Sequence, residues 1–395
     1  MPLPATYYDF IQKIRPYLIE FADNDAELLL KKGINTIGSI DEYDSSFEYC
    51  LKELKEEFIK DLSSKYGYTL NAVPPEQRRV FMALAQAVNF EYHCMVNFSL
   101  SGKKTFHFKD HLADHLAYTE INQKAELIEL PFPSCQFVFS SRAVIDAVHN
   151  IRKEKGRIDM NNGGIDYSAP VSVFITKKET PELHLNGDKL IIVAIHARPP
   201  NKSYAMLKRE IFLGSGWTLE QALRTDWEKL TPDAVKHGTA IDNFEGTEEF
   251  QSDEIFYRDG LLLYRIILNS ILYLSSNDAD LIPQESYRNT INKEAKTLNS
   301  PSKKRKKLQS LARYSELDYQ DVGASVGPIV IDKYIEYDKT KGDGSKSLTG
   351  RFMVRGHWRN QVHGEKRMER KLIWIKPFYK GADLASEINK PYLVK

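Results

Sequence analysis

The stretches VSVFIT at residues 171–176 and KLIIVAIHA at residues 189–197 decide the fold class of this chain. Both are short runs rich in Val and Ile, a composition typical of β-strands. Asn186-Gly187-Asp188 lies between them, and Asn-Gly between two apolar runs is a strong signal for a hairpin. The sequence therefore predicts a pair of strands at its centre.

Sequence around this pair predicts further strands and helices. Residues 206–213 are a candidate third strand, and Thr218 with Gln221 has the spacing of a helix-capping box. Residues 256–274 are predicted to form an apolar helix at the centre of the domain. Towards the N-terminus, apolar residues between Tyr7 and Phe21 recur every three or four positions, which is the spacing of one buried helical face.

Other helices are expected over residues 47–66, 77–100 and 109–118, and strands over 329–337, 348–358 and 371–377. These elements predict an α+β protein, in which a helical N-terminal region packs on a small mixed or antiparallel sheet. A small β-rich unit follows at the C-terminus. The expected divisions are a helical region at 1–130, an α+β region at 131–280, a basic linker at 281–325 and a basic β-rich unit at 326–395.

Composition limits the class of protein. Of the 395 residues, 42% are hydrophobic and 28% charged, as in ordinary globular proteins. Three cysteines cannot build a disulfide framework. The N-terminus lacks the pattern of a secretory signal, and the longest apolar stretch, 261–274, is too short to span a bilayer. We expect a cytoplasmic protein without a membrane partner.

The charge is distributed unevenly along the chain. Although 55 Lys and Arg nearly balance 54 Asp and Glu overall, residues 301–395 contain 21 basic and 11 acidic residues. A basic C-terminal part suggests an anionic partner such as nucleic acid, or docking on the acidic body of the same chain.

A candidate functional site lies in the basic stretch RFMVRGHWR at residues 351–359. Successive side chains of a strand face opposite ways, so one continuous strand would bring its three Arg residues and His357 to one face. Arg presents a planar fork that suits phosphate oxygens, and His titrates near neutral pH. Catalytic roles are assigned to His357, Arg355 and Arg359, and nucleic-acid contacts to Arg351, His363, Lys366, Arg367, Arg370, Lys303, Lys304 and Arg305.

The C-terminal sequence also resembles a known group. The string VRGHWR at 354–359, followed by a basic loop with Gly364, by IWIKP at 373–377 and by Lys380-Gly381, is similar to uncharacterised proteins of bacterial phages, prophages and other mobile elements. The resemblance covers about 30 residues and implies a mobile-element or defence setting, without implying a mechanism.

A second candidate site contains His107, His111 and His115, which would share a stripe if one helix included all three. Two such His with an acid can hold Zn²⁺, but the Glu of metalloprotease helices is missing. We therefore predict structural histidines, no metal and no cofactor. Phosphate-binding glycine loops are absent as well.

Together these observations favour a protein that binds nucleic acid, RNA rather than DNA, in a mobile-element setting. A metal-independent ribonuclease would use the C-terminal Arg/His face. Whether the chain is an enzyme stays open. The alternative is a non-enzymatic interaction or structural protein, whose basic C-terminal unit docks on an acidic surface or on a protein partner.

Overall fold

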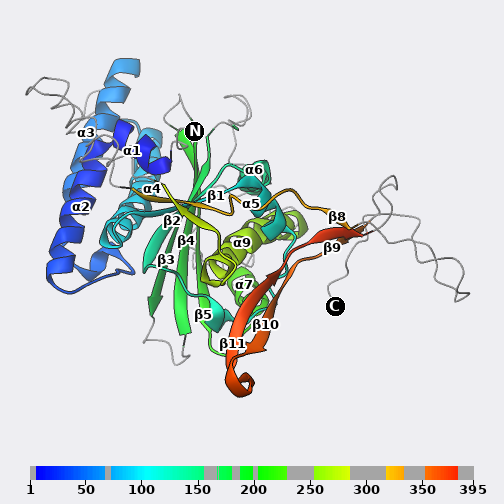
Figure 1. Cartoon of the computed structure of the whole chain (residues 1–395). Helices are drawn as coiled ribbons and strands as arrows, with labels where there is room; N and C mark the ends of the chain where they lie inside the picture. The colour runs from blue at the N-terminus through cyan, green and yellow to red at the C-terminus, as the bar shows by residue number, and fades with distance from the viewer. Residues whose placement is uncertain are drawn as a thin grey trace, which may run out of the picture.

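A seven-stranded mixed sheet forms the centre of the molecule (Figure 1). The computed structural model describes residues 6–66, 73–154, 167, 169–179, 187–198, 203–228, 253–284, 317–332 and 352–380. The sheet has the strand order β5-β4-β3-β2-β1-β7-β6. Its strands are β1 (Lys104–Phe108), β2 (Ser134–Phe139), β3 (Val171–Glu179), β4 (Gly187–Arg198), β5 (Ser203–Gly214), β6 (Leu281–Pro283) and β7 (Asp318–Val322). β1 runs parallel to β2 and β7, and the other pairs are antiparallel.

The predicted pairing of 171–176 with 189–197 is confirmed, with Val171 opposite His196 and Thr176 opposite Ile191. Val173 points into one core and Phe174 into the other. Both faces of these strands are therefore covered, which explains why they are apolar runs without alternating polar residues. The Asn186 position of the predicted turn lies outside the described residues.

Helices cover both faces of the sheet (Figure 1). On one face lie α1 (Tyr7–Ile14), α2 (Pro16–Lys31), α3 (Phe47–Tyr66) and α4 (Pro75–Leu100). On the other lie α5 (Asp110–Ala117), α6 (Arg142–Glu154), α7 (Leu219–Glu228) and α9 (Asp253–Ser275). Short 3-10 turns occur at Ile40–Glu42, Ala125–Leu127 and Glu365–Arg367. The fold is α+β, as predicted, with two hydrophobic cores separated by the sheet.

The predicted helix from Tyr7 to Phe21 is two helices. Arg15 separates α1 from α2 with φ −142° and ψ 62°, and Pro16 begins α2. A proline disfavours helical backbone in the residue before it and has no N–H to continue the hydrogen bonding. The apolar spacing persists across this break, so the pattern alone did not reveal it.

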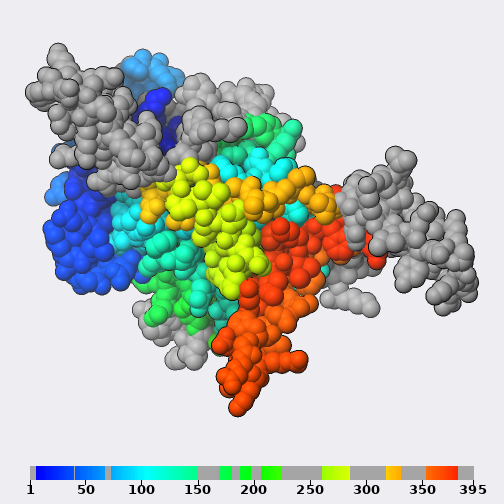
Figure 2. All heavy atoms as spheres, viewed as in Figure 1, coloured from blue at the N-terminus to red at the C-terminus, as the bar shows by residue number. Residues whose placement is uncertain are grey.

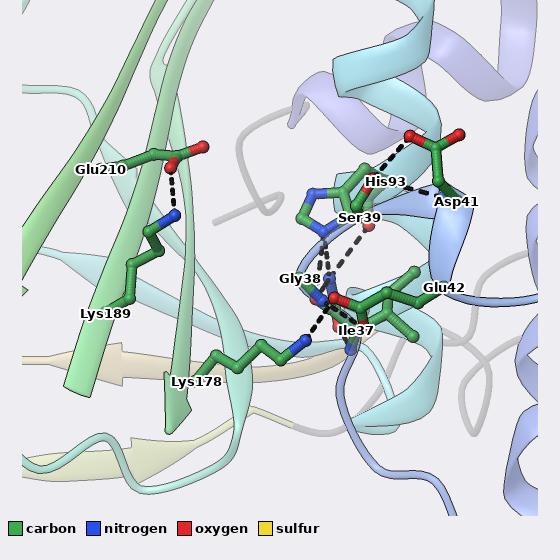
Figure 3. A network of polar contacts seen from close by, with 10 residues as sticks. Ile37, Gly38, Ser39, Asp41, Glu42, His93, Lys178, Lys189 and Glu210 are labelled. Atoms are coloured by element: carbon green, nitrogen blue, oxygen red, sulfur yellow. Dashed lines mark hydrogen bonds and ion pairs between the residues drawn. The ribbon is translucent and has the colours of Figure 1, made fainter. Parts of the chain in front are cut away.

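A polar network joins the helical layer to the sheet (Figure 3). On α4, His93 Nε2 lies 3.0 Å from the carbonyl oxygen of Ile37, and Asn97 Nδ2 donates to the same oxygen at 3.0 Å. Glu42 accepts from the backbone N–H of Gly38 at 3.1 Å and pairs with Lys178 of β3. The loop between α2 and α3 is thus bonded both to a helix and to a strand.

The C-terminal part adds a hairpin and a small sheet. The hairpin pairs β10 (His357–His363) with β11 (Glu369–Ile375), and β12 (Phe378–Lys380) joins β8 (Ile331–Asp332) and β9 (Phe352–Val354). β6 and β7, near the two ends of the predicted linker 281–325, belong to the main sheet. Within the described ranges no helix is long and apolar enough to cross a bilayer.

Candidate functional site

The predicted Arg/His face lies on the β10–β11 hairpin, whose tip projects from the body of the molecule (Figure 2, orange). The strand predicted over 348–358 is interrupted, because β9 ends at Val354 and β10 begins at His357. Between them, Gly356 donates from its N–H to the carbonyl of Tyr118 at 3.0 Å and accepts from the N–H of Glu120 at 2.9 Å. A Cβ at Gly356 would meet Thr119 Oγ1 at 2.7 Å, so this close approach requires glycine.

Two buried tryptophans anchor the base of the hairpin. Trp358 and Trp374 are opposite each other across the two strands, and their rings stack with centroids 6.0 Å apart. Trp358 Nε1 donates to Asn269 Oδ1 of α9 at 2.8 Å, and Trp374 Nε1 donates to Thr119 Oγ1 at 3.1 Å. Each indole thus buries its ring and satisfies its one donor. The Gly and Trp residues of the C-terminal signature hold the hairpin on the body.

His357 and Arg359 lie on the opposite, outward face of β10. Both side chains are exposed, and the strand period of two separates them from the buried Trp358 between them. Their cross-strand neighbours are Ile375 and Ile373. The predicted juxtaposition of these two side chains on one face is therefore present.

The tip of the hairpin carries further cations in an unusual backbone conformation. Gly364 has φ +76°, and Lys366 and Arg367 have φ +54° and +57°. A left-handed conformation costs a residue with a Cβ about 1–2 kcal/mol. The side chains of Lys366 and Arg367 are exposed, and Met368 next to them is 82% exposed. The tip thus presents two cations, the carboxylate of Glu365 and one apolar side chain to solvent.

The other predicted site residues lie elsewhere. Arg355 is half-buried in the connection between β9 and β10, so it does not share the outward face of β10 by strand alternation. Arg370 is exposed on β11 opposite Val362, on the other face of the hairpin. His363 Nδ1 is 3.0 Å from Glu369 Oε2. Outside the described residues lie Arg351, Lys303, Lys304 and Arg305.

The three histidines of the second candidate do not share a helical stripe. His107 lies on β1, whereas His111 is exposed on α5 and His115 is buried there. His115 Nε2 is 3.1 Å from the carbonyl oxygen of Gly327, and its ring packs against Trp374. Burial lowers the pKa of His115. Among the residues that the structure describes, no three His, Cys, Asp or Glu side chains are arranged to hold a metal ion.

The hairpin has a basic surface. Residues 357–375 contain five Lys and Arg against two Glu, and Arg359, Lys366, Arg367 and Arg370 among them are exposed. Such a surface attracts phosphate groups or an acidic protein through long-range electrostatics. Sequence reasoning found these cations but missed Asn269 and Thr119, which orient the hairpin. In the sequence, Asn269 is only a polar interruption of the apolar helix, and no local pattern indicates that it binds Trp358.

Comparison with known proteins gives one family. Residues 106–379, more than half of the chain, match the family described as AcrVA2-like, the anti-CRISPR type V subtype A2 family. The match begins in β1 and extends into β12, so it includes the hairpin and both tryptophans. A search of curated proteins found no match.

Proposed function

Because the chain belongs to the AcrVA2-like anti-CRISPR family, we propose that it counteracts a type V CRISPR system by binding RNA through the β10–β11 hairpin. The family agrees with the phage or mobile-element setting that the C-terminal sequence implies. The effectors of CRISPR systems are guided by RNA. The guide RNA of a type V effector is therefore a target that an RNA-binding surface on this protein could bind.

The observation that carries this proposal is the anchored, outward-facing set of cations on the hairpin. Arg359 on the strand and Lys366 and Arg367 at the tip are exposed, while Trp358 and Trp374 fix the base to α9 and to the loop after α5. A rigid base lowers the entropy lost on binding. Phosphate contacts of this kind position an RNA without reading its sequence.

The geometry favours binding over cleavage. Metal-independent cleavage requires a base and an acid within reach of one phosphate. On the outward face of β10, the next histidine after His357 is His363, six residues further and therefore roughly 20 Å away in an extended strand. Under this proposal, the wild type does not cleave RNA, and His357→Ala weakens RNA binding only slightly. Cleavage of RNA by the wild type that is lost in His357→Ala, with binding retained, would assign His357 a catalytic role instead.

Removing the two tip cations tests the RNA-binding proposal. We expect Lys366→Gln/Arg367→Gln to weaken binding of a labelled single-stranded RNA. Its logarithmic salt dependence should become shallower by about 0.7 for each phosphate that the variant no longer neutralises. Fluorescence anisotropy at increasing salt measures both effects. The matched control is Lys31→Gln/Lys65→Gln, which removes two exposed lysines from α2 and α3 and should change neither.

One observation supports the alternative of a protein partner. Met368 exposes 82% of its surface between the tip cations and Glu369, and exposed methionines adapt to protein surfaces. Binding of the wild type to an RNA-free type V effector, with no binding to the guide RNA alone, would favour this alternative. Binding to the guide RNA with no binding to the bare effector would favour the RNA proposal.

A further inference from the structure

Three parallel strands end at the same edge of the main sheet, and they bring together a serine, a histidine and an aspartate. β1 lies between β2 and β7, and its residue His107 is opposite Asp321 of β7. Ser140 follows the last residue of β2. In sheets of this kind, ligands bind beyond the carboxyl ends of parallel strands. None of these three residues belongs to the β10–β11 hairpin.

Distances connect the three side chains in a chain of contacts. His107 Nδ1 lies 2.9 Å from Asp321 Oδ1, and His107 Nε2 lies 3.4 Å from Ser140 Oγ. Asp321 is itself held in place: Gln284 Nε2 donates to its other oxygen at 2.8 Å, and Lys109 Nζ is 2.7 Å from Oδ1. A serine, a base and a group that orients the base are the parts of a nucleophilic triad, which is recognised by geometry rather than by order in the sequence.

The surroundings set the protonation of the imidazole. Burial lowers the pKa of His107, the hydrogen bond with Asp321 opposes that change, and the positive charge of Lys109 adds to it. Burial alone would raise the pKa of Asp321, but hydrogen bonds from Lys109 and His107 lower it. At neutral pH a neutral imidazole therefore faces a carboxylate. A carboxylate accepts from Nδ1 only when Nδ1 carries the proton, and in that tautomer the lone pair of Nε2 faces the hydroxyl of Ser140.

Ser140 also has the position and the access that a nucleophile needs. Its side chain is half-buried, whereas His107 and Asp321 are only 8% and 9% exposed. It lies in a strand-to-helix turn, because α6 starts at Arg142. The first N–H groups of a helix have no carbonyl partner within that helix. They are suited to an anionic oxygen.

We propose that Ser140 is a nucleophile toward carboxylic esters, with His107 as its general base and Asp321 as the residue that orients His107. Ser140 Oγ bonds to the ester carbonyl carbon while its proton moves to His107 Nε2. The carbonyl electron pair moves onto the oxygen, facing the N-terminus of α6. Collapse of this intermediate expels the alcohol, which takes the proton from Nε2. Water then cleaves the acyl-serine by the same route, releasing a carboxylic acid and restoring the hydroxyl.

The neighbouring serine gives a matched control. Ser141 follows Ser140 but is buried, and its Oγ contacts Asp114 Oδ1 at 3.4 Å instead of a histidine. Ser140→Ala and Ser141→Ala each remove one hydroxyl from the same turn. Only the first removes the group that faces His107.

The test is labelling of the full-length chain with a fluorophosphonate probe, followed by peptide mass spectrometry, beside hydrolysis of p-nitrophenyl acetate. The wild type and Ser141→Ala should be labelled on Ser140, and Ser140→Ala should not be labelled. His107→Gln should slow labelling by roughly 10²–10⁴-fold, with its thermal melting recorded to confirm that it folds. A folded wild type that stays unlabelled, or equal labelling of Ser140→Ala, would overturn the proposal. These results are independent of RNA binding, which the hairpin variants measure separately.

Discussion

At position 91, a carboxyl group lies fully buried in the helical layer. Glu91 of α4 has no exposed surface, and the nearest cation is Arg15, with Nη1 3.9 Å from Glu91 Oε2. Burial raises the pKa of Glu91 to about 7, although the charge of Arg15 opposes this. Such a group is uncharged in the folded protein at pH values at which it is charged in the unfolded chain.

This difference predicts a pH dependence of stability. Between the ordinary pKa of 4.5 and about 7, the folded state binds more protons at Glu91 than the unfolded state does. The stabilisation that the raised pKa of Glu91 adds to the free energy of unfolding is therefore fully present below pH 4.5 and is lost as the pH rises through this window. Across it, the wild type should lose up to about 3 kcal/mol relative to Glu91→Gln, measured by urea denaturation. The exposed Glu20→Gln is the control, and parallel profiles of wild type and Glu91→Gln would contradict the assignment.

A second prediction at the residue scale concerns Asn269. Its Nδ2 donates to the carbonyls of Leu116 and Thr119, and its Oδ1 accepts from Trp358. Asn269→Ala leaves these buried groups without their partner, and each such group costs about 1–3 kcal/mol. The free energy of unfolding should fall by at least that much in denaturant titrations. Asn122→Ala, on the exposed side of the same region, should change it by less than about 0.5 kcal/mol.

The same residues show how far a sequence predicts a site. Exposed cations such as Arg359 and Lys366 were found because a strand period and a basic loop are local patterns. The partners of His107 were not, because Asp321 is 214 residues away along the chain and only the sheet brings them together. Local spacing instead suggested a helical stripe of three histidines, which the strand β1 excludes.

At the scale of elements, the start of α7 was predicted correctly. Thr218 N donates to Gln221 Oε1 at 2.8 Å, and Gln221 N donates to Thr218 Oγ1 at 3.1 Å, which is the predicted capping box. The breaks at Arg15 and at Gly356 were missed. At Arg15, the following proline ends α1 although the apolar pattern continues into α2. At Gly356, the backbone lies against Thr119, and this contact separates β9 from β10.

The capping box gives a prediction for α7. Thr218→Ala should lower the free energy of unfolding by about 1 kcal/mol, because an N–H at the start of the helix loses its acceptor. Gln221→Ala removes the reciprocal bond, so the double variant should cost less than the sum of the two single variants. Thermal and urea denaturation of the three variants measure this coupling. Simple additivity would show that the two bonds act independently.

At the scale of the whole molecule, the sheet crosses the predicted domain boundaries. β7, which lies in the stretch predicted as a linker, pairs with β1 of the predicted helical region over five residues. The order of strands along the chain does not reveal this, because local patterns carry no information on which strands become neighbours. The division of the chain into four parts remains a prediction from composition.

This topology changes the expected outcome of proteolysis. The basic run at 303–307 offers trypsin several sites, and we expect cleavage there from the sequence. The C-terminal fragment contains β7 and both tryptophans of the hairpin, which are embedded in the sheet and in the core. The two fragments should therefore elute together in native size-exclusion chromatography and separate only in denaturant. Separation under native conditions would show that this packing does not hold the fragments together.

The position of β7 also bears on the order of events at the ribosome. β1 is synthesised more than 200 residues before the strand that covers one of its edges. Until residue 322 has left the ribosome, the nascent chain carries an incomplete sheet in which one edge of β1 is unpaired, and an unpaired strand edge can pair with other chains. A chain that ends near residue 300 would thus expose this unpaired edge and aggregate. Premature termination would therefore remove the activity of the protein and also produce misfolded protein in the cell that synthesises it.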